Sequence, residues 1–79
     1  SITVQGDCPI YALERALQRE LSFVIDEEIE VATIAGLILH TLGAIPKEGV
    51  TVSFPNFSAT IERIQGARIK QVRIRPINK

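Results

Sequence analysis

The spacing of apolar residues changes near Pro46, and this change constrains the fold more than any other feature of the sequence. Within residues 10–21 and 34–42 apolar residues recur at steps of three and four, whereas beyond residue 50 they recur at every second position. Steps of three and four place side chains on one stripe of a helix, and steps of two place them on one face of a strand. The sequence therefore predicts helices first and a run of strands afterwards.

The clearest helix is predicted between Thr33 and Gly43. Thr33 is a favourable N-cap residue, and Gly43 stands where a left-handed residue commonly ends a helix. The stripe expected to face the core comprises Ile34, Leu37, Ile38 and Leu42. Gly36 lies inside this helix, where a glycine costs about 1 kcal/mol relative to alanine. We therefore expect another backbone segment to pass close to Gly36.

A short strand and an amphipathic helix are predicted before it. Residues 2–5 form a half-buried strand, and the helix begins at Pro9, with Cys8 as the N-cap residue, because a proline tolerates the first helical position. Its apolar stripe comprises Ile10, Leu13, Ala16, Leu17 and Leu21. The acidic residues within 26–30 lack the spacing of a calcium loop, so this segment is interpreted as a solvated connecting loop.

Three strands are predicted after the turn at residues 46–49. The first alternates at Val50, Val52 and Phe54, a reversal follows at residues 55–57, and a hairpin turns at Gly66-Ala67. This turn pairs Ile64 with Ile69, Ile61 with Val72, and Ala59 with Ile74. Because Ile61 and Ile64 are three residues apart, a bulge is required near Arg63.

These elements predict one α+β domain spanning residues 1–79. The order is strand, helix, acidic connector, helix and three-stranded meander, with both helices packed on one face of a mostly antiparallel sheet. A hydrophobic content of 46% with 23% charged residues is typical of a compact globular module. A single cysteine favours a reducing compartment, and no apolar run reaches the roughly 20 residues that a membrane-spanning helix needs.

No constellation of residues indicates catalysis, a metal site or a cofactor. His40 is the only histidine and Cys8 the only cysteine, and they are far apart in the sequence. A structural zinc site needs about four such ligands, and an activated thiol needs a neighbouring base. The five glycines form no phosphate-binding loop. We therefore predict no catalytic residue, no metal ligand and no cofactor.

Charge is divided unevenly along the chain. Residues 1–46 carry seven acidic and two basic residues, and residues 47–79 carry seven basic and two acidic residues. The cations concentrated on the last hairpin are Arg63, Arg68, Lys70, Arg73 and Arg75. They are the candidate contact site for an anionic partner, and a solvated strand face is the alternative. Nucleic acid is not the predicted partner, because no aromatic residue is interleaved with these cations.

Several short motifs spread over nearly the whole chain carry a resemblance to a known family. They are V-x-G at residues 4–6, the helix with Leu13 and Leu17, T-I-A-G-L at 33–37, L-G-x-I-P-x-x-G at 42–49, and G-x-R-I-x-x-V-R-I at 66–74. Together they resemble the CorC/HlyC transporter-associated domain. Cys8 departs from the Ser or Thr usual in the family, and the reversal within F-P-N-F is shorter than usual.

The resemblance implies a fold similar to the FAD-binding domain of some flavoproteins. It also implies a C-terminal, cytosolic fragment of a longer protein, following a membrane domain and a pair of CBS domains in magnesium and cobalt efflux or hemolysin-like proteins. The expected function is non-catalytic regulation of ion transport at the cytoplasmic side of the cell membrane, through contacts with these domains of the same parent. A homodimer stays open, as does the alternative function of a sensor for a small ligand or an adenine or flavin nucleotide.

Overall fold

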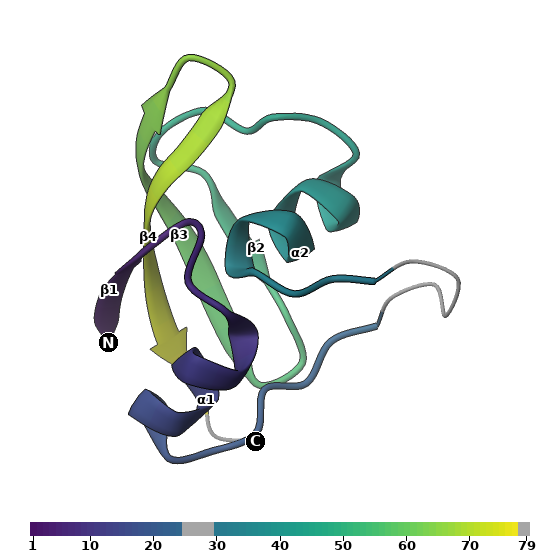
Figure 1. Ribbon diagram of the computed structural model, residues 1–79, viewed down its shortest axis with the longest axis vertical. Coiled ribbons are helices and arrows are strands. Elements are labelled where there is room, and N and C mark those ends of the chain that lie inside the picture. The colour runs from purple at the N-terminus through teal and green to yellow at the C-terminus, as the bar shows by residue number, and fades with distance from the viewer. Residues whose placement is uncertain (25–29, 78–79) are drawn as a thin grey trace.

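The computed structural model describes residues 1–24 and 30–77 of the chain. Its elements are β1 (Ile2–Gln5), α1 (Ile10–Leu17), α2 (Ile34–Leu42), β2 (Thr51–Ser53), β3 (Phe57–Gln65) and β4 (Arg68–Pro76). In Figure 1 the long β3–β4 hairpin forms the centre of the sheet, with α1 below it and α2 to its right. The predicted α+β fold and order of elements are confirmed. No helix in this described part of the chain is long and apolar enough to span a bilayer.

The four strands form one sheet in the order β1-β4-β3-β2, and each neighbouring pair is antiparallel. The first strand therefore pairs with the last, with Val4 opposite Val72. This pairing makes β3 and β4 the central strands and leaves β1 and β2 at the edges.

The hairpin has the predicted register. Its pairs include Ile64 with Ile69, Ile61 with Val72, and Ala59 with Ile74. The register shifts between Ile61 and Arg63 and again between Arg63 and Ile64, so the bulge lies where the three-residue spacing required it. Gly66 has φ of 59°, which is the left-handed conformation that a tight turn needs.

One face of the sheet is covered and the other is open. Fully buried side chains come from both layers: Leu13, Ile34, Leu37 and Ile38 from the helices, and Phe57, Ile61, Val72 and Ile74 from the sheet. They form a single core, so both helices pack on the same face of the sheet. The alternate residues of the strands, which include Thr3, Thr51, Ser58, Thr60 and Arg73, leave the opposite face polar.

Helix α2 is capped as predicted but packs differently at two positions. Thr33 accepts a hydrogen bond from the N–H of Gly36 at 3.1 Å, and Gly43 is left-handed at φ 73°. Leu42 was expected in the core but is 41% exposed at the last position of the helix. The close backbone expected at Gly36 is also wrong. An added Cβ there would meet the side chains of Thr33 and Val31, at 3.2 and 3.9 Å.

Helix α1 is shorter than predicted. Pro9 is its N-cap residue, so Cys8 lies outside the helix and does not cap it. The helix ends at Leu17 because Gln18 adopts a left-handed conformation, at φ 56°. Leu21 is nevertheless buried, because its N–H donates to the Glu14 carboxylate at 2.8 Å and the loop folds back under the helix. Ala16, also expected on the apolar stripe, is exposed.

The edge strand β2 is shorter than the predicted alternation. Val50 lies before the strand and is 37% exposed, while Val52 and Phe54 are buried. The rings of Phe54 and Phe57 stack with centroids 4.5 Å apart across the predicted reversal. Between them, the Asn56 side chain accepts from the N–H of Ser22 and donates to the carbonyl of Glu20, both at 2.8 Å. Asn56 therefore ties the loop after α1 to this turn.

Candidate functional site

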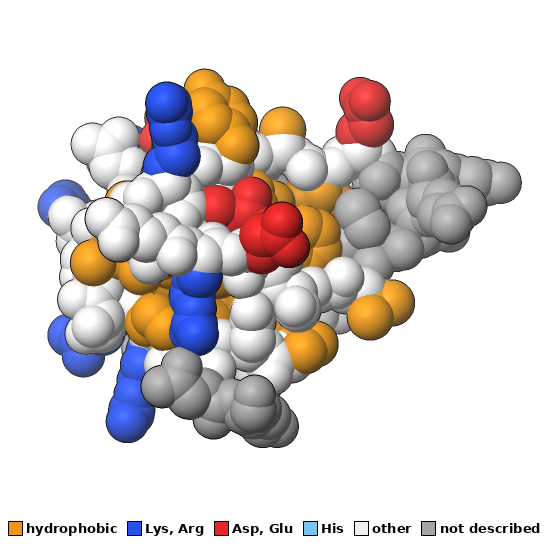
Figure 2. Space-filling model, turned by 90° about the horizontal axis from the view of Figure 1, so that it is seen from below, with side chains coloured by type: hydrophobic (Ala, Val, Ile, Leu, Met, Phe, Trp, Pro, Cys, Tyr) orange, Lys and Arg blue, Asp and Glu red, His pale blue; other side chains and the backbone are white. Residues whose placement is uncertain are grey.

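The five candidate cations are all exposed, but the structure does not gather them into one patch. Figure 2 views the molecule from the end that carries α1. Lys and Arg side chains line its left edge, the side on which the sheet lies in Figure 1, and Asp and Glu side chains gather nearer the centre. The cations of β4 are divided among three depressions of the surface, described in turn below.

Arg73 and Arg75 lie on the open face of the sheet. They line a shallow depression of about 370 Å³ together with Ser1, Thr51, Ser58 and Thr60. The sheet register explains this grouping, because Arg73 pairs with Thr60 and Arg75 pairs with Ser58 across the β3–β4 ladder. Thr51 then pairs with Thr60 on the next strand. Guanidinium and hydroxyl groups from three adjacent strands therefore meet on one surface.

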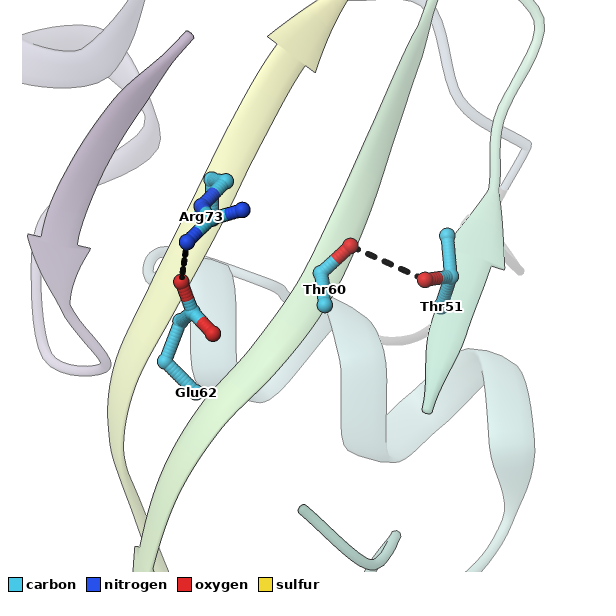
Figure 3. A network of polar contacts seen from close by, with 4 residues as sticks. All are labelled: Thr51, Thr60, Glu62 and Arg73. Atoms are coloured by element: carbon cyan, nitrogen blue, oxygen red, sulfur yellow. Dashed lines mark hydrogen bonds and ion pairs between the residues drawn. The ribbon is translucent and has the colours of Figure 1, made fainter. Parts of the chain in front are cut away.

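Two polar contacts order this face, as Figure 3 shows. The Arg73 guanidinium forms an ion pair with the Glu62 carboxylate at 2.5 Å, and the hydroxyls of Thr51 and Thr60 are hydrogen-bonded at 2.9 Å. The side chain of Arg73 keeps 54% of its surface exposed and that of Glu62 keeps 29%. The ion pair is therefore solvated, and a pair of this kind contributes little to stability.

Arg68 lies elsewhere, at the tip of the hairpin. It lines a second depression of about 310 Å³ with Asp7, with residues of the α2 start and with Leu39. Lys70 and Arg68 line a smaller depression beside β1, again with Asp7. This end of the hairpin therefore carries both signs of charge. Arg63 is exposed at the bulge and lines none of these three depressions.

Cys8 and His40 show no features of reactive centres. Burial, and secondarily the charge of Asp7, raises the pKa of the Cys8 thiol, so the thiol is held protonated at neutral pH. Its Sγ lies 3.5 Å from the carbonyl oxygen of Pro9. Within residues 1–24 and 30–77, no three His, Cys, Asp or Glu side chains gather where they could hold a metal ion. Of the acidic segment, residues 26–29 lie outside the described residues, and Glu30 is exposed.

The hydroxyl residues of the open face were missed by sequence reasoning. Thr51, Ser58 and Thr60 occupy the positions that alternate with the inward-facing Val52 and Ala59. The same alternation that predicted the strands therefore placed these hydroxyls on one face. The alternation does not reveal the order of the strands in the sheet. That order places Arg73 and Arg75 of β4 beside these hydroxyls.

Comparison with known proteins identifies the family. The model of the CorC_HlyC transporter-associated domain matches residues 1–78. The chain belongs to this family. The predicted resemblance is thereby confirmed over almost the whole sequence, and the motifs that carried it are the caps, turns and hairpin described above. A search of curated proteins returned no match.

Solved structures share the fold of this CorC_HlyC domain. A conserved domain from Neisseria meningitidis MC58 is 28% identical, with 99% of each chain covered and a TM-score of 0.76. The transporter associated domain of a CBS domain protein from Porphyromonas gingivalis is 21% identical, covering 96% of this chain and 87% of that one, with a TM-score of 0.77.

A third structure carries a more specific description. It is the region associated with a putative Mg²⁺ and Co²⁺ transporter (CorC) from Neisseria meningitidis MC58. It is 21% identical, covers 95% of this chain and 86% of that chain, and has a TM-score of 0.75. At this level of identity the last two likenesses establish the shared fold alone.

Proposed function

We propose that this CorC_HlyC domain is a non-catalytic regulatory module of a membrane ion transporter. The observation that carries the proposal is the family match over residues 1–78, to a domain described as transporter associated. Structural relatives from a CBS domain protein and from a Mg²⁺ and Co²⁺ transporter region support it. The domain then lies on the cytoplasmic side of the membrane, as the C-terminal part of a parent that also contains a membrane domain and a CBS pair.

In this proposal the domain regulates by contact and holds no reaction centre. The cations at the far end of the hairpin, Arg63, Arg68 and Lys70, make no ion pair with other described residues. Arg68 and Lys70 outnumber Asp7, the acidic residue that lines the depressions with them. An excess of exposed charge of one sign steers an oppositely charged partner more than it stabilises the fold. An acidic surface on the adjoining CBS domains is the partner that fits this end, and an acidic surface on a second copy of the chain is the competing one.

The decisive experiment measures ion efflux by the parent protein in proteoliposomes, with and without the residues of this chain. We expect transport to persist without the domain while its dependence on internal ion concentration changes. A truncated parent that folds and inserts normally but transports with an unchanged ion dependence would contradict a regulatory role.

The contact is tested separately, with matched charge variants. Isothermal titration of the domain with the upstream cytosolic region should give binding that weakens as salt rises. The double variant R68Q/K70Q should weaken that binding, whereas K47Q, which removes an exposed cation from the loop before β2, should leave it unchanged. Equal losses in both variants would indicate a diffuse charge effect instead of a docking surface. Self-association of the domain without binding to the upstream region would favour the homodimer.

A further inference from the structure

The open face of the sheet carries a polar depression that the proposed regulatory contact does not use. Its lining combines two guanidinium groups of β4 with hydroxyls from β2, β3 and Ser1, and no apolar side chain is among the residues that form it. A surface that packs against another protein has an apolar centre, whereas a site for a small charged ligand offers convergent polar groups. The chemistry of this depression therefore fits a small polar ligand better than a protein partner.

We propose that this depression binds the phosphate group of a small molecule, held by Arg73 and Arg75 with hydroxyl donors from Thr51, Ser58 and Thr60. A guanidinium presents several N–H donors in a fixed plane that matches the oxygens of a phosphate. Arg73 and Arg75 are two residues apart on β4, and both line the same depression. Hydroxyls on the neighbouring strands supply the additional donors that a tetrahedral oxyanion accepts.

Arg75 is available for such a ligand. Within residues 1–24 and 30–77 it forms no ion pair, and its cross-strand neighbour is Ser58. An incoming phosphate therefore gains a charge-assisted contact at Arg75 without first breaking one. The cation is exposed, so a ligand can reach it directly from solvent.

Arg73 shows that this face accepts an oxyanion. Its guanidinium already holds the carboxylate of Glu62, an anion supplied by the chain itself. A ligand phosphate must share Arg73 with this carboxylate or displace it. Glu62 therefore competes with every anion for Arg73 and lowers its affinity. A singly charged carboxylate is disfavoured most, because its interaction with Arg73 is equivalent to the one that Glu62 already makes.

The paired threonines add a directed donor. Between the hydroxyls of Thr51 and Thr60 only one proton is used, because one oxygen donates and the other accepts. The accepting hydroxyl keeps its own proton free. Since Thr51 and Thr60 both line the depression, that proton can be donated to a bound phosphate oxygen.

The test is an NMR titration of the 79-residue chain with inorganic phosphate and with ATP, using chloride at matched ionic strength as the control. We expect saturable shifts of the amide signals of Thr51, Ser58, Thr60, Arg73 and Arg75 with phosphate or ATP, and none with chloride. Tighter binding of ATP than of phosphate would identify a nucleotide as the source of the phosphate, and equal binding would identify free phosphate. The absence of saturable shifts with either would overturn the proposal.

Charge variants make the test specific to this site. Loss of the Arg75 fork in R75Q should weaken binding by about tenfold or more, and R75K should fall between R75Q and the unmodified chain. Removal of the competing carboxylate in E62Q should strengthen binding. The matched control K70Q removes an exposed cation from the same strand and should leave the affinity unchanged. An affinity that falls equally in K70Q and R75Q, or that does not rise in E62Q, would overturn the site.

The two proposals fail independently. Phosphate binding at the open face is tested with variants of Arg75 and Glu62. The regulatory contact is tested with R68Q/K70Q and by measuring ion efflux through the parent protein. A domain that binds the upstream cytosolic region normally but does not bind phosphate would overturn only the proposed ligand site.

Discussion

Replacement of Gly6 by alanine should disrupt the fold, because Gly6 is the glycine whose added Cβ would collide with another backbone segment. Gly6 directly follows β1, where its N–H donates to the carbonyl of Lys70 at 3.0 Å and its carbonyl accepts from the N–H of Ala35 at 2.9 Å. An added Cβ would lie 2.0 Å from the carbonyl oxygen of Ile69. At Gly6 the backbone that follows β1 therefore lies against the backbones of β4 and of the start of α2.

The size of the effect follows from these distances. Ordinary contact with a Cβ begins at 3.4 Å, so the backbones must separate by about 1.4 Å. A shift of that size lengthens the 3.0 Å bond to Lys70 beyond hydrogen-bonding range. Overpacking of this kind costs about 1–3 kcal/mol, and each lost hydrogen bond adds about 0.5–1.5 kcal/mol. We expect a loss of about 2–5 kcal/mol, against a total stability of about 4–12 kcal/mol for a domain of this length.

Thermal and urea unfolding of G6A measure this loss directly. For a domain of this size each kcal/mol lowers Tm by about 4–8 °C, so we expect a fall of about 8–40 °C. The matched control is G36A, whose Cβ meets only side chains. There the gain in helix propensity offsets the close contact with Thr33, so the change should stay within about 1 kcal/mol. A G6A domain as stable as G36A would refute the close approach of β1 and β4.

Three further predictions concern the loops and the thiol. N56A should cost about 1–2 kcal/mol by removing both bonds to the loop after α1, and N56D, which keeps the acceptor, should cost less in the same urea melts. Q18G should raise Tm, with a gain of about 0.5–1 kcal/mol, because glycine relieves the left-handed strain at φ 56°, whereas Q18A should give no gain. Cys8 should be alkylated more slowly in the folded than in the unfolded chain at mildly alkaline pH, because burial and Asp7 raise its pKa. Because the pKa of Cys8 is higher in the folded chain than in the unfolded chain, the protonated thiol favours folding. This contribution to the free energy of unfolding should be complete below the pKa of the unfolded chain and should be lost as pH rises through the pKa of the folded chain.

The hairpin could be predicted in detail because its evidence is local and redundant. Three pairs of apolar residues fix one register between β3 and β4, and a shift of one residue would turn them all toward solvent. The bulge followed from the same count, since Ile61 and Ile64 cannot both face inward on a regular strand. The α2 caps were equally local, because the side chain of Thr33 and the freedom of Gly43 act within one turn of helix.

The errors arose where contacts between distant segments decide the outcome. The sequence shows that Gly6 and Gly36 are glycines, but only the packing of β1 against β4 reveals that Gly6 is the residue with no room for a side chain. Helix α1 ends early because Gln18 adopts a left-handed conformation that its residue type does not favour, and Leu21 is buried beyond this end. Neither the conformation of Gln18 nor the burial of Leu21 changes the apolar periodicity from which helix α1 was predicted.

The division of the cations has a similar cause and matters more for function. Inward-facing Ile69 and Val72 are three residues apart, so alternation around them turns Arg68 outward along with Arg73 and Arg75. The cations were predicted as one surface because all five lie on the last hairpin. A bulge increases the local twist of a hairpin, and beyond the one at Arg63 the tip carries Arg68 to the depression beside the start of α2. One run of charge thus lies on two surfaces, and a variant that neutralises the whole run would confound the proposed contact at one with the proposed phosphate site at the other.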